Sequence, residues 1–257
     1  MSLFLMLSLR ENEAVAASEY RDFVQATGLS PELLEHRIFD SAGFRVGDVS
    51  RYDGIFVGGS SLNMSTPQYG AWQVAVVREL SSLLDSPTPV FFTCFGTGLI
   101  AQVLGGRIGH EYAEQTSASR VELTAAGRTD PVFGSLPTTF EALTGHTECV
   151  IDPSPRATVV ASGPTCLVQA LRVGPHTWAT QFHPEMDVEG MARRMNFYRH
   201  HGYFPDEEFE AIVDSLRGVD TSHAHRILRN FVGYCRARAA TEPEEAADYT
   251  VEACMRS

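Results

Sequence analysis

Residues 89–102, with the sequence PVFFTCFGTGLIAQ, decide how this chain folds and where its chemistry lies. The five residues before Cys94 favour a strand, glycines follow at positions 96 and 98, and a helix-forming run comes next. This order predicts a strand, a sharp turn and a helix, the arrangement known as a nucleophile elbow. A side chain at such a turn projects above the sheet edge beside helix N–H groups, which favour a thiolate and can stabilise an oxyanion. Cys94 is therefore the candidate nucleophile.

Residues 181–185, QFHPE, supply the candidate base. His183 and Glu185 are two positions apart, and on a strand that spacing places both side chains on one face. Glu185 would then orient an imidazole that serves Cys94. Nucleophile, base and orienting acid are thus present in the chemical types that a triad requires.

The rest of the chain alternates strand and helix patterns around these two stretches. We expect strands at 3–8, 34–39, 53–57 and 88–93, helices at 12–27, 68–84 and 97–104, mainly strands and turns over 107–182, and helices at about 187–200, 206–217 and 221–239. This order predicts an α/β fold with a twisted, mostly parallel sheet flanked by helices. Active groups in such sheets gather at the carboxyl ends of the strands, where Gly59, Cys94 and His183 would lie. We expect residues 1–200 to form one domain and residues 201–257 a helical C-terminal extension packed on it.

Composition narrows the class of protein without choosing one. The net charge of −12 argues against nucleic-acid binding, since phosphate recognition needs a basic surface. The apolar run Leu3–Leu9 is too short to span a bilayer and indicates a buried first strand. Five cysteines without regular spacing do not indicate a disulfide framework or a zinc site, so we expect a cytoplasmic protein without metal or cofactor.

A family resemblance joins these motifs. Residues 94–96 (CFG), 99–106 (LIAQVLGG) and 182–185 (FHPE) resemble the class I glutamine amidotransferases, in particular stand-alone members similar to the amidotransferase domain of GMP synthetase. Three further segments match in order: residues 53–60 (DGIFVGGS) resemble the oxyanion strand and turn, residues 121–137 the central hairpin, and residues 145–150 (GHTECV) a histidine-containing substrate segment. The resemblance implies a flavodoxin-like fold.

The resemblance also implies acyl transfer through a thioester. The Cys94 thiolate would attack the γ-carboxamide of glutamine or of another γ-glutamyl amide. The N–H groups of Gly59 and Phe95 would hold the oxyanion, while His183 would protonate the departing ammonia and Glu185 would fix the imidazole. Substrate contacts are expected at Gly58, Thr97, Gly98, His146 and Thr147. No synthase domain is fused to this sequence, so a separate synthase subunit would accept the ammonia.

Two departures from the family pattern bear on specificity. Phe92 stands where the family has glycine, and Thr97-Gly98 replaces a histidine and a glutamine that contacts the substrate. A pocket without that glutamine favours a bulkier γ-glutamyl substrate over free glutamine. Two alternatives therefore stay open: a γ-glutamyl peptide hydrolase, and a binding or regulatory protein on a catalytically degenerate fold. The other cysteines, Cys149, Cys166, Cys235 and Cys254, have the pattern of structural thiols.

Overall fold

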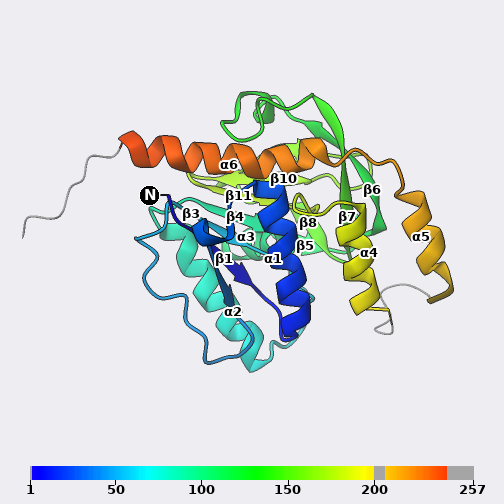
Figure 1. Ribbon diagram of the computed structural model, residues 1–257, viewed down its shortest axis with the longest axis horizontal. Helices are drawn as coiled ribbons and strands as arrows, with labels where there is room; N and C mark the ends of the chain where they lie inside the picture. The colour runs from blue at the N-terminus through cyan, green and yellow to red at the C-terminus, as the bar shows by residue number, and fades with distance from the viewer. Residues whose placement is uncertain (1, 200–205, 242–257) are drawn as a thin grey trace, which may run out of the picture.

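The computed structural model describes residues 2–199 and 206–241 (Figure 1). Within these residues, nine strands form one mixed sheet in the order β2-β1-β3-β4-β11-β10-β9-β6-β7, and β5 and β8 form a separate pair. The strands are β1 (Phe4–Ser8), β2 (Leu34–Ile38), β3 (Gly54–Val57), β4 (Val90–Thr93), β5 (Arg107–Gly109), β6 (Glu114–Leu123), β7 (Thr139–His146), β8 (Cys149–Asp152), β9 (Ala157–Ser162), β10 (Ala170–Val173) and β11 (Thr177–Thr180).

The sheet has a parallel part and an antiparallel part. Strands β2, β1, β3, β4 and β11 pair in parallel, and β10, β9, β6 and β7 continue the sheet with antiparallel pairs. The helices are α1 (Glu13–Thr27), α2 (Ala71–Ser82), α3 (Phe95–Val103), α4 (Val188–Phe197), α5 (Phe209–Ser215) and α6 (Ser222–Thr241). The predicted α/β fold with a helical C-terminal region is confirmed.

Alternation along the parallel strands sends side chains to two cores. Phe4 and Met6 of β1 pack with helices α1 and α6, which lie together on one face of the sheet in Figure 1. Leu5 and Leu7 of the same strand pack with α2 and α3 on the other face. Because both faces are covered, these strands are continuous apolar runs, as the sequence from Leu3 to Leu9 indicated.

Helix α6 is bound to the centre of the sheet by aromatic contacts. The Phe231 ring lies 5.2 Å from Phe56, 5.5 Å from Phe91 and 5.8 Å from Trp178, measured between ring centroids, each in an edge-on arrangement. Such pairs add about 0.5–1.5 kcal/mol each beyond their burial. A boundary at residue 200 stays a prediction, because residues 200–205 and 242–257 lie outside the described part of the chain.

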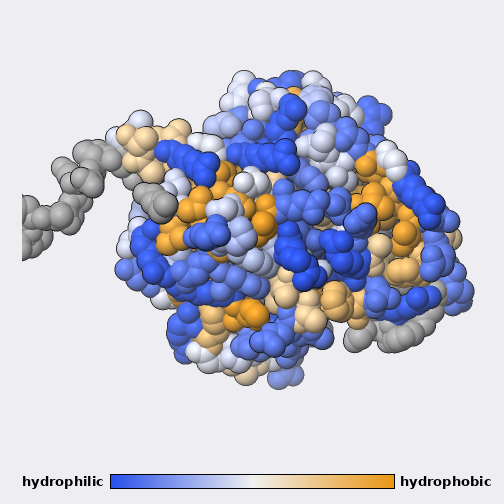
Figure 2. Space-filling view, in the orientation of Figure 1, coloured by the Kyte–Doolittle hydropathy of each residue, from blue (hydrophilic) through white to orange (hydrophobic). Residues whose placement is uncertain are grey.

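Helices α4 and α5 close the end of the sheet nearest β7. Met191 and Met195 of α4 are buried in a cluster with Ile212 and Val213 of α5 packed against it. Figure 2 shows apolar side chains gathered between these two helices on the face in view. Among the described helices, not one combines the length and the apolarity that crossing a membrane demands.

Candidate active site

The candidate site lies at the carboxyl edge of the parallel strands. Arg10 follows β1, Gly59 follows β3, Cys94 follows β4, and His183 follows β11. Since these four strands are neighbours in the sheet, four loops distant in sequence meet at one edge.

Cys94 occupies a strained turn between β4 and α3. Its φ of 51° and ψ of −92° make it the one non-glycine residue with a positive φ in the described part of the chain. The Cys94 N–H donates to the Thr180 carbonyl at 2.6 Å, and the Thr97 N–H donates to the Cys94 carbonyl at 2.9 Å. Backbone strain of this kind is held by the surrounding structure at functional sites. The predicted nucleophile elbow is present.

Phe92 fits into the elbow because position 96 is glycine. The Phe92 ring is fully buried against α2 and α3. A Cβ at Gly96 would lie 2.3 Å from Phe92 Cβ, which is closer than any real carbon contact. The absence of a side chain at position 96 therefore leaves the space that Phe92 occupies.

His183 and Glu185 form a buried pair, though not on a strand as expected. Strand β11 ends at Thr180, and both residues lie in the turn beyond it, where Pro184 has no N–H to continue a ladder. The turn still aligns the two side chains, since His183 Nδ1 donates to Glu185 Oε1 at 2.7 Å. The His183 N–H donates to the Leu143 carbonyl of β7 at 2.9 Å, which fixes the turn on the sheet.

Electrostatics favour an imidazolium at His183. Burial alone would lower the pKa of His183, but the charge of Glu185 and a hydrogen bond with Cys94 outweigh it and raise the pKa to about 10. The reactive form of a cysteine is the thiolate, for which a protonated imidazole is a counter-ion. Glu185 is 1% exposed, so its charge acts on His183 with little screening.

Gly59 lies where the two reactive side chains meet. A Cβ at this position would lie 3.6 Å from Cys94 Cβ, an ordinary contact, but 3.1 Å from His183 Cε1, so a side chain here would displace the imidazole. Phe95 is the first residue of α3, and its N–H has no partner within the helix. Both predicted oxyanion donors thus border the cysteine.

Two pockets open beside Cys94 and share Ser60 and Ser61. We name the smaller one, of about 50 Å³, the Glu148 pocket; it is lined by Ser60, Ser61, Leu62, Asn63, Cys94, Phe95, Gly98, His146, Thr147, Glu148 and Gln181. We name the larger one, of about 110 Å³, the Arg194 pocket; it is lined by Arg10, Ser60, Ser61, Cys94, Thr116, Gly145, His183, Met186, Met191, Arg194, Met195 and Tyr198.

Gly98 opens onto a carboxylate rather than onto empty space. A Cβ at position 98 would lie 3.3 Å from Glu148 Oε1. Glu148 is held in place by the N–H groups of Met64 and Ser65, which donate to its two oxygens at 2.8 and 2.9 Å. The chain therefore places an acidic group close to the position from which the family's glutamine would project.

The predicted substrate residues divide into two groups. Gly98, His146 and Thr147 line the Glu148 pocket, and Thr147 donates to Asn63 Oδ1 at 3.0 Å. Gly58 instead packs against Glu19, whose carboxyl carbon would lie 2.6 Å from a Cβ at position 58. Thr97 is fully buried, and its hydroxyl donates to the Thr180 carbonyl at 3.0 Å. The proposed contacts of Gly58 and Thr97 with substrate gain no support from these positions, and all five stay predictions.

His146 belongs to a buried network as well as to the pocket. Its Nδ1 contacts the Glu148 carbonyl at 2.9 Å, and its Nε2 donates to Glu114 Oε2 at 3.0 Å. The remaining donors to Glu114 are three hydroxyls and one amide, from Ser119, Thr144, Thr165 and Gln169. Burial by itself would raise the pKa of Glu114, but these hydrogen bonds outweigh it and lower the pKa to about 2.

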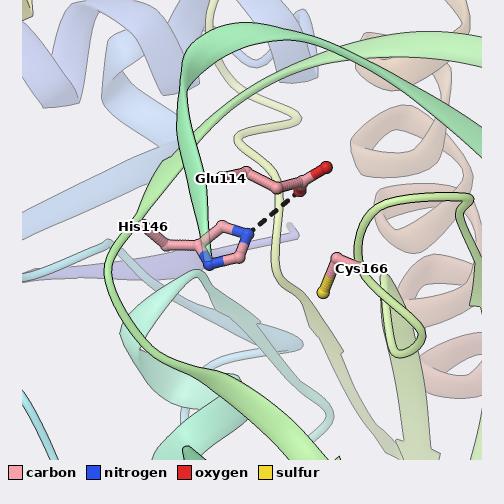
Figure 3. A group of neighbouring side chains, drawn as sticks. All are labelled: Glu114, His146 and Cys166. Atoms are coloured by element: carbon pink, nitrogen blue, oxygen red, sulfur yellow. Dashed lines mark hydrogen bonds and ion pairs between the residues drawn. The ribbon is translucent and has the colours of Figure 1, made fainter. Parts of the chain in front are cut away.

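Glu114, His146 and Cys166 are close enough together to be considered as metal ligands (Figure 3). Their ligand atoms lie within 4.8 Å of one another. However, Glu114 and His146 would have to give up hydrogen bonds made within the protein, and burial raises the pKa of Cys166 to about 12. This chemistry fits a structural network better than a metal site.

The Arg194 pocket contains a charged cluster that the sequence analysis did not identify. Glu19 Oε1 accepts hydrogen bonds from Arg10 Nη2 at 2.7 Å and Arg194 Nη2 at 3.4 Å, and all three residues are buried. One signal in the sequence pointed to it. Glu19 lies on the apolar face of α1, in step with Val15 and Phe23, where a charged residue is unusual.

Cys94 differs from the other cysteines of the described chain. Cys149, Cys166 and Cys235 are buried, and burial raises the pKa of each. Cys94 is partly exposed and lines both pockets. The structural roles predicted for the first three agree with this burial, while Cys254 lies outside the described residues.

Comparison with known proteins gives a consistent family. The sequence profile described as "Glutamine amidotransferase class-I" matches residues 27–210. The chain is 26% identical to γ-glutamyl peptidase 3 of Arabidopsis thaliana over 158 residues, covering 60% of this chain and 62% of that protein. It is 31% identical to the glutamine-hydrolysing GMP synthase of Aeropyrum pernix over 104 residues, covering 40% of this chain and 20% of that protein.

The fold agrees with that of a solved glutamine amidotransferase. A glutamine amidotransferase from Thermotoga maritima superposes with a TM-score of 0.73 and 16% identity, covering 91% of this chain and 99% of that one. The matches to the two curated relatives span only about three fifths and one fifth of their lengths.

Proposed function

The chain belongs to the class I glutamine amidotransferase family, and we propose that it cleaves a γ-glutamyl amide through a thioester on Cys94. The observation that carries this proposal is the meeting of Cys94 and His183 beside Gly59. A strained cysteine, a histidine with its own buried acid and two backbone donors form the set of groups that acyl transfer uses.

Each group has a definite task in the proposed reaction. The Cys94 thiolate attacks the γ-carbonyl carbon, and the N–H groups of Gly59 and Phe95 stabilise the oxyanion. His183 gives its Nε2 proton to the departing nitrogen and then accepts a proton from the water that hydrolyses the thioester. Glu185 keeps the imidazole oriented through Nδ1. Removing one oxyanion donor typically lowers turnover by about 10²–10³-fold.

The Glu148 pocket suits the glutamyl part of such a substrate. The α-ammonium group common to glutamine and γ-glutamyl peptides is cationic, and Glu148 presents a carboxylate next to Gly98. Gln181 adds an amide 3.9 Å from Cys94 Sγ. These polar groups support recognition of the γ-glutamyl end, whatever amine is attached.

Two other roles are alternatives to hydrolysis. Similarity to proteins named as GMP synthases favours ammonia transfer to a separate synthase chain as the first alternative, and a partner would then raise glutamine turnover. A binding protein on this fold would keep the geometry without the chemistry. The triad geometry favours an enzyme, since a binding role gives no reason for a His183–Glu185 pair beside Cys94.

Covalent labelling tests the proposal. We expect 6-diazo-5-oxo-norleucine, a glutamine-like electrophile, to modify Cys94 much faster than Cys149, Cys166 or Cys235, as read by peptide mass spectrometry. Wild-type protein should release glutamate from glutamine or γ-glutamyl peptides, and the Cys94→Ser variant should not. Equal labelling of Cys94 and these three buried thiols, with no Cys94-dependent glutamate release, would refute the proposal.

A further inference from the structure

The two pockets beside Cys94 define two directions for a bound amide. An amide attacked at its carbonyl carbon has an acyl side and an amine side, which must occupy different spaces. Cys94 lines both pockets, whereas His183, the proposed proton donor to the departing nitrogen, lines the Arg194 pocket and is not among the described residues that line the Glu148 pocket. The departing amine is thus directed into the Arg194 pocket.

The wall of this pocket carries an excess of positive charge. The guanidinium groups of Arg10 and Arg194 share the single carboxylate of Glu19. The other acids nearby do not line the pocket, since Asp22 pairs with Arg193 at 2.8 Å and Glu185 pairs with His183 at 2.7 Å. Among the described residues, the lining itself therefore presents the two arginines and no carboxylate, in a region where screening is weak.

Both arginines also retain hydrogen-bonding capacity. Arg10 is 5% exposed and Arg194 is 7% exposed, so each keeps a small accessible surface at the pocket, and the Nε atom of each, like Glu19 Oε2, is buried without a hydrogen-bond partner in the described part of the chain. Buried donors without partners are uncommon, and a guanidinium is suited to a carboxylate. Arg10 Nη2 lies 3.5 Å from the position that a Cβ at Gly59 would take, so the cluster borders the reacting atoms.

The remaining wall is apolar and adaptable. Met186, Met191 and Met195 are each less than 5% exposed and line the pocket. Methionine packs against side chains of varied shape. The volume of about 110 Å³ is comparable with the roughly 150 Å³ cavity that holds a benzene ring, so one side chain fills it rather than a long peptide.

We propose that the Arg194 pocket binds the departing amino acid of a γ-glutamyl dipeptide, with its carboxylate at Arg10 and Arg194 and its apolar side chain among the methionines. This inference rests on the proposed function and narrows its substrate class. Ammonia or an ammonium ion gains nothing from this cationic, apolar wall, whereas an amino acid with an apolar side chain is complementary to it.

The reaction balances without any further reactant. Cys94 Sγ bonds to the γ-carbonyl carbon, the C–N bond breaks, and the amino acid leaves with a proton from His183. Water then adds its hydroxyl to the acyl carbon and its proton to His183, and the C–S bond breaks to restore the thiolate. The products are glutamate and one apolar amino acid.

The test compares γ-glutamyl-leucine with γ-glutamyl-leucinamide, which lacks only the carboxylate charge. For the wild-type chain we expect kcat/KM to be at least about 10-fold higher for the acid, mainly through KM, because an ionic hydrogen bond to a buried arginine is lost in the amide. Arg194→Gln should bring the ratio close to one, and Arg194→Lys should retain part of it. Arg217→Gln, which removes an exposed arginine paired with Asp214 and outside the pocket lining, is the matched control and should keep the wild-type ratio.

Binding decides the question even without turnover. In titration calorimetry with Cys94→Ala protein, the acid should bind at least about 10-fold more tightly than the amide, and Arg194→Gln in that background should abolish the difference. Equal affinities, or a preference that survives Arg194→Gln, would overturn the inference. Cys94-dependent glutamine hydrolysis with no preference for the acid would refute this inference alone, whereas no hydrolysis and no selective labelling of Cys94 would refute the proposed function.

Discussion

Two buried carboxylates, Glu114 and Glu19, are held in opposite ways. Glu114 accepts hydrogen bonds from His146, from hydroxyl groups on β6 and β7, and from the Gln169 amide in the loop before β10. Glu19 is shared by Arg10 and Arg194, which outnumber it. Both oxygens of Glu114 have donors, whereas one oxygen of Glu19 has no partner in the described part of the chain and the two arginines around it line a pocket. A polar group whose hydrogen bonds are made within the fold contributes to stability, and a charged group that lines a pocket is available to a ligand.

The largest effect that we expect is on the chemistry. His183→Asn should reduce kcat/KM for any γ-glutamyl substrate by at least about 10³-fold, since it removes both the acid and the base of the proposed reaction. The change also breaks the buried pair with Glu185, so we expect a lower melting temperature, but the loss of kcat/KM should persist at 25 °C for protein that remains folded. Calorimetric melting and steady-state rates measured together would show this, and near-normal turnover would exclude His183 from the reaction.

Glu114→Gln should have the reverse profile. We expect a loss of about 1–3 kcal/mol in the free energy of unfolding, the range for leaving a buried hydrogen-bonding group without its partner, while kcat at 25 °C stays within a few-fold for the molecules that remain folded. Chemical denaturation provides the measurement. A stable Glu114→Gln protein would show that the network is not structural.

Acid should weaken the same network in the wild type. The pKa of Glu114 is about 2 in the folded protein against an ordinary 4.5, so the carboxylate adds stability above pH 4.5. That contribution should be lost progressively as the pH falls from about 4.5 to 2. Unfolding titrations across this range should be steeper for the wild type than for Glu114→Gln, and identical slopes would contradict the assignment.

A smaller effect is expected at the orienting acid. Glu185→Gln removes the charge that raises the pKa of His183 against the effect of burial. The imidazolium should then lose its proton at a lower pH, and the alkaline limb of the kcat/KM profile should therefore move to a lower pH than in the wild type. We expect activity at pH 7 to fall by about 10²-fold. An unmoved alkaline limb would mean that Glu185 does not tune the base.

The smallest effect that we expect is on the stability of the nucleophile elbow at Cys94. Gly96→Ala should cost about 1–3 kcal/mol, because its Cβ would overlap Phe92 Cβ. Phe92→Gly removes the Cβ that a side chain at position 96 would overlap, so the double variant should be less destabilised than the sum of the single variants. Strict additivity in denaturation experiments would show that the contact of Phe92 with residue 96 is not the constraint.

The sequence was a good guide where local pattern and chemistry agree. The run before Cys94 and the glycines after it predicted the elbow, because a strand, a turn and a helix each have a short-range signature. The pair in QFHPE was predicted for the wrong local reason, since it lies in a turn rather than on a strand. Its contact survives because two residues on either side of a proline can still meet at hydrogen-bonding distance.

By itself, the sequence determined the α/β order of elements, the helical C-terminal region and the identity of Cys94, His183 and Glu185 as candidates. These depend on spacing within a few residues, which propensity and periodicity record. Only the tertiary structure decided that Glu148 stands beside Gly98 and that Arg10 and Arg194 share Glu19. Those partners are 9 to 175 positions apart in the chain, beyond the reach of a local sequence pattern. Their charges also interact strongly only when they are buried and weakly screened, and that burial requires the packed sheet and helices.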